Sequence, residues 1–91
     1  MIFLIIRRKN EYKNQIKDIL KKNIFELADV EISDELELIS KGYLESFDII
    51  NIISILEIKF NINMPIEEIE MIDFNTVNNI YCLIERIKAL E

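Results

Sequence analysis

Residues 42–48 read Gly-Tyr-Leu-Glu-Ser-Phe-Asp and lead directly into a very apolar segment that continues to Phe60. Gly42 is the only glycine of the chain, and glycine readily adopts the positive φ angles that a tight turn can require. Ser46 is a favoured N-cap residue, because its hydroxyl oxygen can accept a hydrogen bond from an amide two or three positions further on. We therefore predict a turn that places Ser46 at the start of a helix.

The start of such a helix is a suitable place for a phosphate group. The first amides of a helix lack intrahelical partners, and the helix dipole is positive at this end. A phosphodiester on Ser46 would therefore be tolerated. The alternative is that Ser46 serves only as a helix cap, which is the common role of a serine before an apolar helix.

The segment after Ser46 has the period of a helix, which we expect to span about residues 47–60. One stripe of its apolar residues is assigned to the core: Ile49, Ile52, Ile53, Leu56 and Phe60. Four further apolar residues fall outside this stripe: Phe47, Ile50, Ile55 and Ile58. A helix that is apolar on more than one side is either deeply buried or keeps a face for a partner.

Three other helical segments are expected. Helical spacing of apolar residues predicts a first helix over about residues 10–27, with Lys13, Lys17, Lys21 and Lys22 on its other face. Pro65 suits the first turn of a short helix over roughly residues 66–71. Asn75 or Thr76 would cap a last helix that runs to about Leu90, with its core stripe at Val77, Ile80, Ile84 and Ile87.

The apolar period is lost between Ala28 and Tyr43, which predicts a long connection with a short helical turn around residues 35–39. Period-2 alternation is absent, so strands are not expected. A chain of 91 residues supports a single core. The fold class predicted is therefore all-α: a bundle of three longer helices and one short helix, with a long loop between helices 1 and 2.

Charge and composition limit the function. The net charge is −6, with about +5 in residues 1–24 and −11 in residues 25–91, which argues against nucleic acid and favours basic partners for the second part. The chain has no histidine, so the usual nucleophile pairs and zinc ligands cannot form. The carboxylates around residues 34–37 and 67–70 lack the spacing of a calcium loop. We therefore expect neither an enzyme nor a metal site.

A single cysteine, Cys82, cannot form an internal disulfide, which fits a reducing compartment, and the cytoplasm is the default location. We interpret Cys82 as a packing residue without a functional role. The apolar run Met1–Ile6 is too short to span a bilayer, and the basic residues 7–9 follow it instead of preceding it as in an export signal. It is therefore expected to be neither a membrane anchor nor a signal.

Residues 1–9 are interpreted as an apolar and basic extension of a domain formed by residues 10–91. The extension could lengthen the first helix, cover an apolar patch, or be disordered. We favour packing against the domain or against a second copy, because exposed apolar residues are unfavourable in water. A monomer is expected, with self-association through Met1–Ile6 left open.

The order of these landmarks resembles the acyl carrier protein family over about residues 13–90. The features that match are the turn and serine at residues 42–48, Phe60-Asn61-Ile62, Met64-Pro65, and Phe74-Asn75-Thr76-Val77, preceded by Leu38-Ile39. The resemblance implies that Ser46 accepts 4′-phosphopantetheine from coenzyme A through a separate phosphopantetheinyl transferase. The thiol of this arm would hold an acyl, aminoacyl or peptidyl group as a thioester, for fatty acid or secondary metabolite biosynthesis or another acylation pathway.

The resemblance also implies that acyl-loading and acyl-using enzymes dock on the second helix. The positions implied are Glu45, Phe47, Asp48, Ile50, Asn51, Ser54, Glu57 and Ile58. Glu45 stands where the family usually has Asp, and Asn51, Ser54 and Lys59 occupy positions that are often acidic in fatty-acid carriers. The competing interpretation is a small acidic helical adaptor that binds a partner and is never modified.

Overall fold

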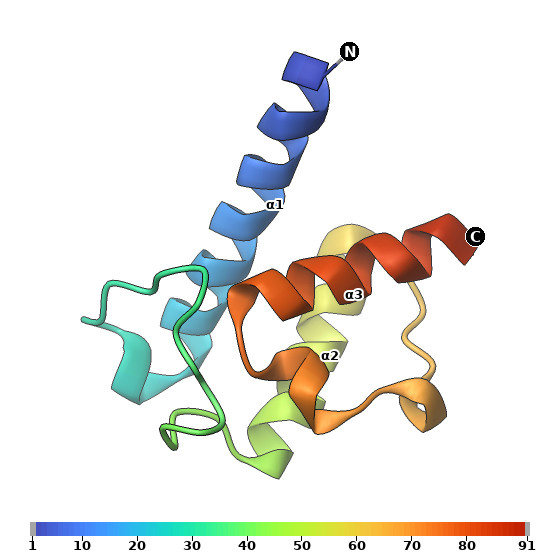
Figure 1. The fold of residues 1–91 in the computed structure, drawn as a ribbon. Helices are drawn as coiled ribbons and strands as arrows, with labels where there is room; N and C mark the ends of the chain where they lie inside the picture. The colour runs from blue at the N-terminus through green and yellow to red at the C-terminus, as the bar shows by residue number, and fades with distance from the viewer. Residues whose placement is uncertain (1, 91) are drawn as a thin grey trace.

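The computed structural model describes residues 2–90, which form three α-helices and three short 3₁₀ turns (Figure 1). The α-helices are α1 (Ile2–Asn23), α2 (Ser46–Phe60) and α3 (Val77–Leu90), and the 3₁₀ turns are η1 (Phe25–Leu27), η2 (Ile66–Glu68) and η3 (Met71–Phe74). Helix α1 packs against both α2 and α3. Residues 2–90 contain no strand, so the all-α prediction is confirmed.

The core forms where the apolar stripes of the three helices meet. All five residues predicted for the stripe of α2 are buried, and so are the four predicted for α3, together with Leu83. Helix α1 contributes Ile16, Ile19 and Leu20. The Tyr12 ring packs edge-on against Phe60 at the end of α2, with 4.9 Å between ring centroids. The helical period was therefore sufficient to predict the buried face of α2 and, apart from Leu83, that of α3.

The bounds of α1 differ from the prediction at both ends. The helix begins at Ile2 instead of Asn10, because residues 2–9 contain neither glycine nor proline, and Leu4 and the three basic residues are good helix formers. It ends at Asn23, whose side chain donates a hydrogen bond to the Ile19 carbonyl (2.8 Å). Ile24 is then extended, and Leu27 reaches the core from η1.

The single short helix predicted over residues 66–71 is wrong. Pro65 precedes η2 as its N-cap, but Ile69 and Glu70 are extended and separate η2 from η3. The Glu70 amide donates a hydrogen bond to Asp73 Oδ2 (2.9 Å), and this bond starts the second turn. The helical turn expected around residues 35–39 is shifted and incomplete: residues 28–45 contain no helix, but the Lys41 amide donates a hydrogen bond to the Glu37 carbonyl (3.2 Å).

A buried lysine anchors the long loop between α1 and α2. Lys13, expected on the polar face of α1, is buried, and its Nζ lies 3.2 Å from Asp34 Oδ2. Lys17 Nζ lies 2.8 Å from the other carboxylate oxygen, and the backbone carbonyl of Asp34 accepts a hydrogen bond from the Asn78 amide (3.1 Å). The hydrogen bond from Lys17 is the main cause that lowers the pKa of Asp34. Asp34 thus joins the loop to both α1 and α3.

Replacing Asp34 with Asn should destabilise the chain, because Lys13 would remain buried without a counter-charge. The Asp34 side chain is itself 38% exposed, so solvent screening limits the loss to about 1 kcal/mol of unfolding free energy. Urea titration at neutral pH measures it. Asp18→Asn is the matched control, because Asp18 makes an exposed pair with Lys22 on α1, and this variant should lose much less.

The ion pairs of Asp34 with Lys13 and Lys17 should also make the stability of the chain depend on pH. Because the pKa of Asp34 is lowered in the folded chain, its contribution is complete above the ordinary value of 3.8 and is lost as the pH falls through the lower folded value. The stability difference between Asp34→Asn and the unaltered chain should therefore shrink below about pH 4. A difference that stays constant down to pH 2 would contradict this account.

Candidate functional site

The turn before α2 is held by hydrogen bonds to the backbone carbonyl of a buried leucine, Leu38. Gly42 has φ of +83°, and the space around its Cα is open, so the backbone conformation is what favours glycine at this position. The amides of Tyr43 and Leu44 both donate hydrogen bonds to the Leu38 carbonyl (2.8 and 3.0 Å). Because Leu38 and Leu44 are both buried, the turn is anchored in the core at each end.

Asn75 ties this turn to the start of α3. Its Oδ1 atom accepts hydrogen bonds from the amides of Ile39 (2.9 Å) and Ser40 (3.1 Å), and its backbone carbonyl accepts one from Leu38 (2.6 Å). Thr76 caps α3 instead, since its Oγ1 accepts a hydrogen bond from the Asn79 amide (3.0 Å). The sequence left the cap open between these two neighbours and did not identify Asn75 as a positioning residue, because no local pattern shows a contact made across 36 positions.

Ser46 is the first residue of α2 and is exposed, but it is not the cap that the sequence predicted. The N-cap is Glu45, which is extended and whose amide donates a hydrogen bond to Asp48 Oδ2 (3.0 Å). Since Ser46 already has helical backbone angles, its hydroxyl is not placed to cap the following amides. Within residues 2–90 the hydroxyl makes no hydrogen bond, and Ser46 is exposed.

A cleft of about 230 Å³ adjoins Ser46, between α2 and the segment that carries η2 and η3. Ser46 and Glu70 are its polar lining residues, and the remainder are apolar: Ile49, Ile50, Ile53, Ile66, Ile69 and Met71. A second cleft of about 180 Å³ shares Met71 and reaches Asn75. The serine therefore lies at the edge of an apolar surface. Sequence reasoning missed this surface because residues 66–72 come from turns that lack a helical period.

The eight positions predicted for docking differ in how available they are. Six are exposed, and among these the apolar side chains of Phe47, Ile50 and Ile58 are 69%, 65% and 84% exposed. The other two are half-buried and have local structural roles. Asp48 accepts the hydrogen bond from the Glu45 amide, and Glu57 Oε2 accepts one from the Met64 amide (2.9 Å). Docking on this face stays a prediction.

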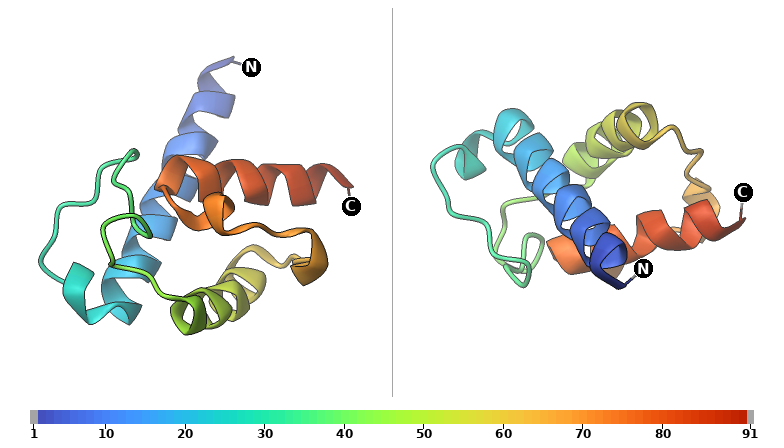
Figure 2. Two further views of the ribbon diagram at one scale, coloured as in Figure 1. Left: turned by 60° about the horizontal axis from the view of Figure 1, so that its bottom comes forward. Right: turned by 90° about the horizontal axis from the view of Figure 1, so that it is seen from above.

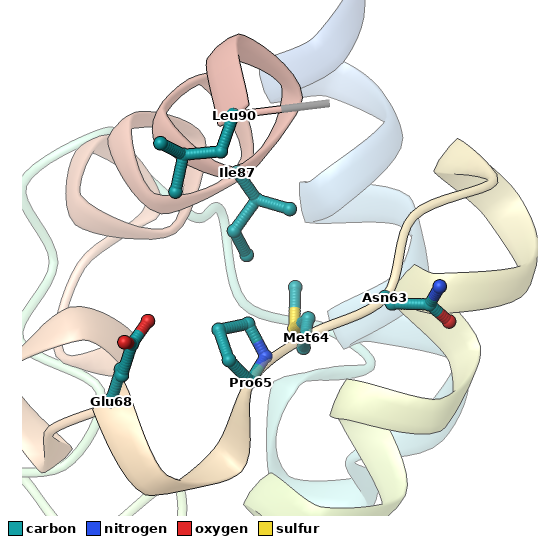
Figure 3. A pocket seen from close by; sticks show the side chains of 6 residues that line it. All are labelled: Asn63, Met64, Pro65, Glu68, Ile87 and Leu90. Atoms are coloured by element: carbon teal, nitrogen blue, oxygen red, sulfur yellow. The ribbon is translucent and has the colours of Figure 1, made fainter.

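A larger cleft, of about 410 Å³, lies near the ends of α2 and α3 (Figure 3). Met64 and Pro65 line it from one side, and Ile87 and Leu90 from the other. It shares no lining residue with the cleft beside Ser46. It is therefore separate from the serine.

Other reactive groups do not extend the site. Cys82 is exposed, so the expectation that it packs in the interior is wrong. Among residues 2–90, no three Cys, Asp or Glu side chains gather as a metal site would require. No helix of the described chain is long and apolar enough to cross a membrane.

The small helical bundle, with an exposed serine at the start of its second long helix, agrees with the fold expected of a carrier protein. No family model matches the chain. It is 31% identical over 78 residues to the D-alanyl carrier protein of Bacillus velezensis, and the match covers 86% of this chain and 99% of that relative. The chain therefore belongs to the acyl carrier protein family, and it is a carrier and not an enzyme.

Asn75→Ala should loosen the turn before α2, because the amides of Ile39 and Ser40 would lose their acceptor. Leaving such groups unpaired costs about 1–3 kcal/mol, towards the lower end here because Ser40 is exposed. Hydrogen exchange of these two amides should be faster in the variant than in the unaltered chain, while exchange in the buried segments of α2 should change less. Asn14→Ala, an exposed change on α1, is the control and should leave both amides unaffected. Unchanged exchange in Asn75→Ala would contradict the role given to Asn75.

Proposed function

We propose that the chain carries an acyl or aminoacyl cargo on a 4′-phosphopantetheine group attached to Ser46. The observation that carries this proposal is the position of Ser46: it is exposed at the first residue of α2, and its hydroxyl is left free because Glu45 and Asp48 form the cap. The carrier role of the family supports the attachment of a group at this serine.

The residues around Ser46 fit this group. Its phosphate would be bonded to Ser46 Oγ, next to the free amides and the positive dipole end of α2. The apolar cleft beside Ser46 offers a surface for the arm or its cargo. When attached, the group supplies a thiol that holds the cargo as a thioester.

The surface around Ser46 also fits brief contacts with other proteins. Glu45 and Glu70 are exposed there and favour approach by a basic partner, while Phe47 and Ile50 offer apolar contact. We expect a phosphopantetheinyl transferase and the enzymes that load and use the cargo to dock on this face, in the cytoplasm where coenzyme A is available. The exposed Ile66 and Ile72 extend the apolar part of the surface beyond α2.

We further propose that the cargo is an aminoacyl group, for which D-alanine is the first candidate. The support is the name of the relative, which describes a D-alanyl carrier. The other cargo classes, from fatty acid or secondary metabolite biosynthesis, are alternatives that a loading experiment distinguishes.

Incubation with coenzyme A and a broad-specificity phosphopantetheinyl transferase should add the mass of one phosphopantetheine to the chain, because a single exposed serine begins α2. Intact-mass spectrometry measures the addition. Ser46→Ala should abolish it, whereas the matched variants Ser40→Ala and Ser54→Ala, which alter other exposed serines, should still be modified. Modification of Ser46→Ala, or no modification with several transferases, would contradict the proposal.

Cargo loading provides a separate test. The modified chain, incubated with labelled D-alanine, ATP and a D-alanine-activating enzyme, should acquire a label that hydroxylamine releases, as expected for a thioester. L-alanine and a fatty acid, each with its own activating enzyme, serve as competitors. Efficient loading by the fatty-acid enzyme alone would contradict the aminoacyl proposal and leave the attachment at Ser46 standing.

A further inference from the structure

The N-terminal turns of α1 extend away from the rest of the bundle (Figures 1 and 2). Ile2 is 75% exposed, and the side chains of residues 7–11 are all exposed. The first buried side chain of α1 among those described is that of Lys13. The bundle therefore buries none of these described side chains, and among them it contacts Lys9 through the Tyr81 ring of α3, whose centroid lies 5.8 Å from Lys9 Nζ.

The order of residues along these turns is unusual. Residues 2–6 are Ile-Phe-Leu-Ile-Ile, and residues 7–9 are Arg-Arg-Lys. Successive positions of an α-helix lie about 100° apart around its axis. Five consecutive apolar positions therefore encircle the helix, and the three cationic positions after them are spread over most of the next turn. The helix is therefore apolar on all sides over residues 2–6 and cationic over residues 7–9, and it is not an amphipathic helix with one apolar face.

The arrangement disfavours a protein partner. A groove on a protein surface covers one side of a helix, but here the apolar positions occur on every side. Two copies associated in parallel through these turns would also bring six cationic side chains together, which is repulsive. The interior of a lipid layer, in contrast, surrounds an inserted segment on all sides.

In place of the packing against the domain or a second copy that the sequence favoured, we propose that the N-terminal turns of α1 dock the chain on the surface of an anionic lipid bilayer without spanning it. Residues 2–6 insert among the acyl chains, and Arg7, Arg8 and Lys9 contact the anionic headgroups. Five helical residues rise about 7 Å, which matches the depth reached by interfacial segments but is far too short to span the bilayer. The inference rests on α1 alone and does not depend on the proposed function.

Docking in this way leaves the site accessible. The beginning of α2 lies at the opposite end of the molecule from the N-terminal turns in Figure 1 and in the left view of Figure 2. Most of the acidic residues follow position 24. Surface charges are screened over about 8 Å at physiological ionic strength, so the acidic part of the bundle opposes docking only where it approaches the bilayer closely.

Co-sedimentation with lipid vesicles tests the proposal. The full chain should bind vesicles that contain phosphatidylserine, should bind vesicles of phosphatidylcholine alone much more weakly, and should be released by high salt. Changing Arg7, Arg8 and Lys9 to Gln should weaken binding by about fivefold for each charge removed. The matched control changes Lys21, Lys22 and Lys41 to Gln, which alters the net charge equally, and it should bind like the unaltered chain.

Ile5→Asp separates lipid insertion from a purely electrostatic contact, and it should lower vesicle binding by more than about tenfold. Circular dichroism and sedimentation without lipid accompany each variant, so that a loss of folding is recognised. Three results would overturn the proposal: no binding to anionic vesicles, equal weakening by the control, or a dimer of the full chain in sedimentation that Ile5→Asp dissociates. The last result would assign the segment to a second copy of the chain.

Discussion

The burial of one face of α2 is the constraint on which the site depends. Its five core residues from Ile49 to Phe60 are all buried, and each buried side chain of this size contributes about 1.5–3 kcal/mol. Because helical positions have fixed angular spacing, this burial sets the rotation of α2 about its axis. Ile50 and Ile58 are consequently exposed, and Ser46, the first residue of the helix, lies at the surface.

The loop before α2 needs further restraints, because sixteen residues without a helical period cannot order themselves through a core stripe. Two polar residues supply them. Asp34 holds the middle of the loop to Lys13 and Lys17 of α1, and Asn75 holds the end of the loop to the start of α3. Leu38 and Leu44 then bring the turn into the core next to Ser46. The position of the serine is thus set by contacts that come from all three helices.

Those features that repeat with the helical period could be predicted from the sequence. The core residues predicted for α2 and α3 are all buried, but the buried Leu83 of α3 was not among them, and Ser46 was correctly placed at the beginning of α2. The errors concern groups whose state depends on one particular side-chain partner, which is distant for Lys13 and three positions away for Glu45 and Glu70. Lys13 is buried because Asp34 reaches it from the loop. Glu45, and not Ser46, is the N-cap of α2, because Asp48 accepts a hydrogen bond from the Glu45 amide. The two 3₁₀ turns replaced one helix for a similar reason, since the Asp73 side chain interrupts a segment that otherwise favours continuation.

The structure separates the chain into regions with different chemistry. Ser46, the neighbouring apolar cleft and the exposed face of α2 form the carrier region, while the turns of α1 before Asn10 form an apolar and cationic region at another end of the molecule (Figure 1). Ser46 is exposed, and so are Ile2 and residues 7–9 of the other region. A carrier that docks through one region can therefore still present its serine to partner enzymes.

The central claim is that the chain carries its group on Ser46, beside the apolar cleft between α2 and residues 66–71. Comparison of backbone amide chemical shifts before and after treatment with transferase and coenzyme A tests it most directly. The account predicts that the largest changes occur at residues 45–50, with smaller changes at residues 66–71 and little change along α1. Changes centred on Ser33, Ser40 or Cys82, with residues 45–50 unaffected, would contradict it.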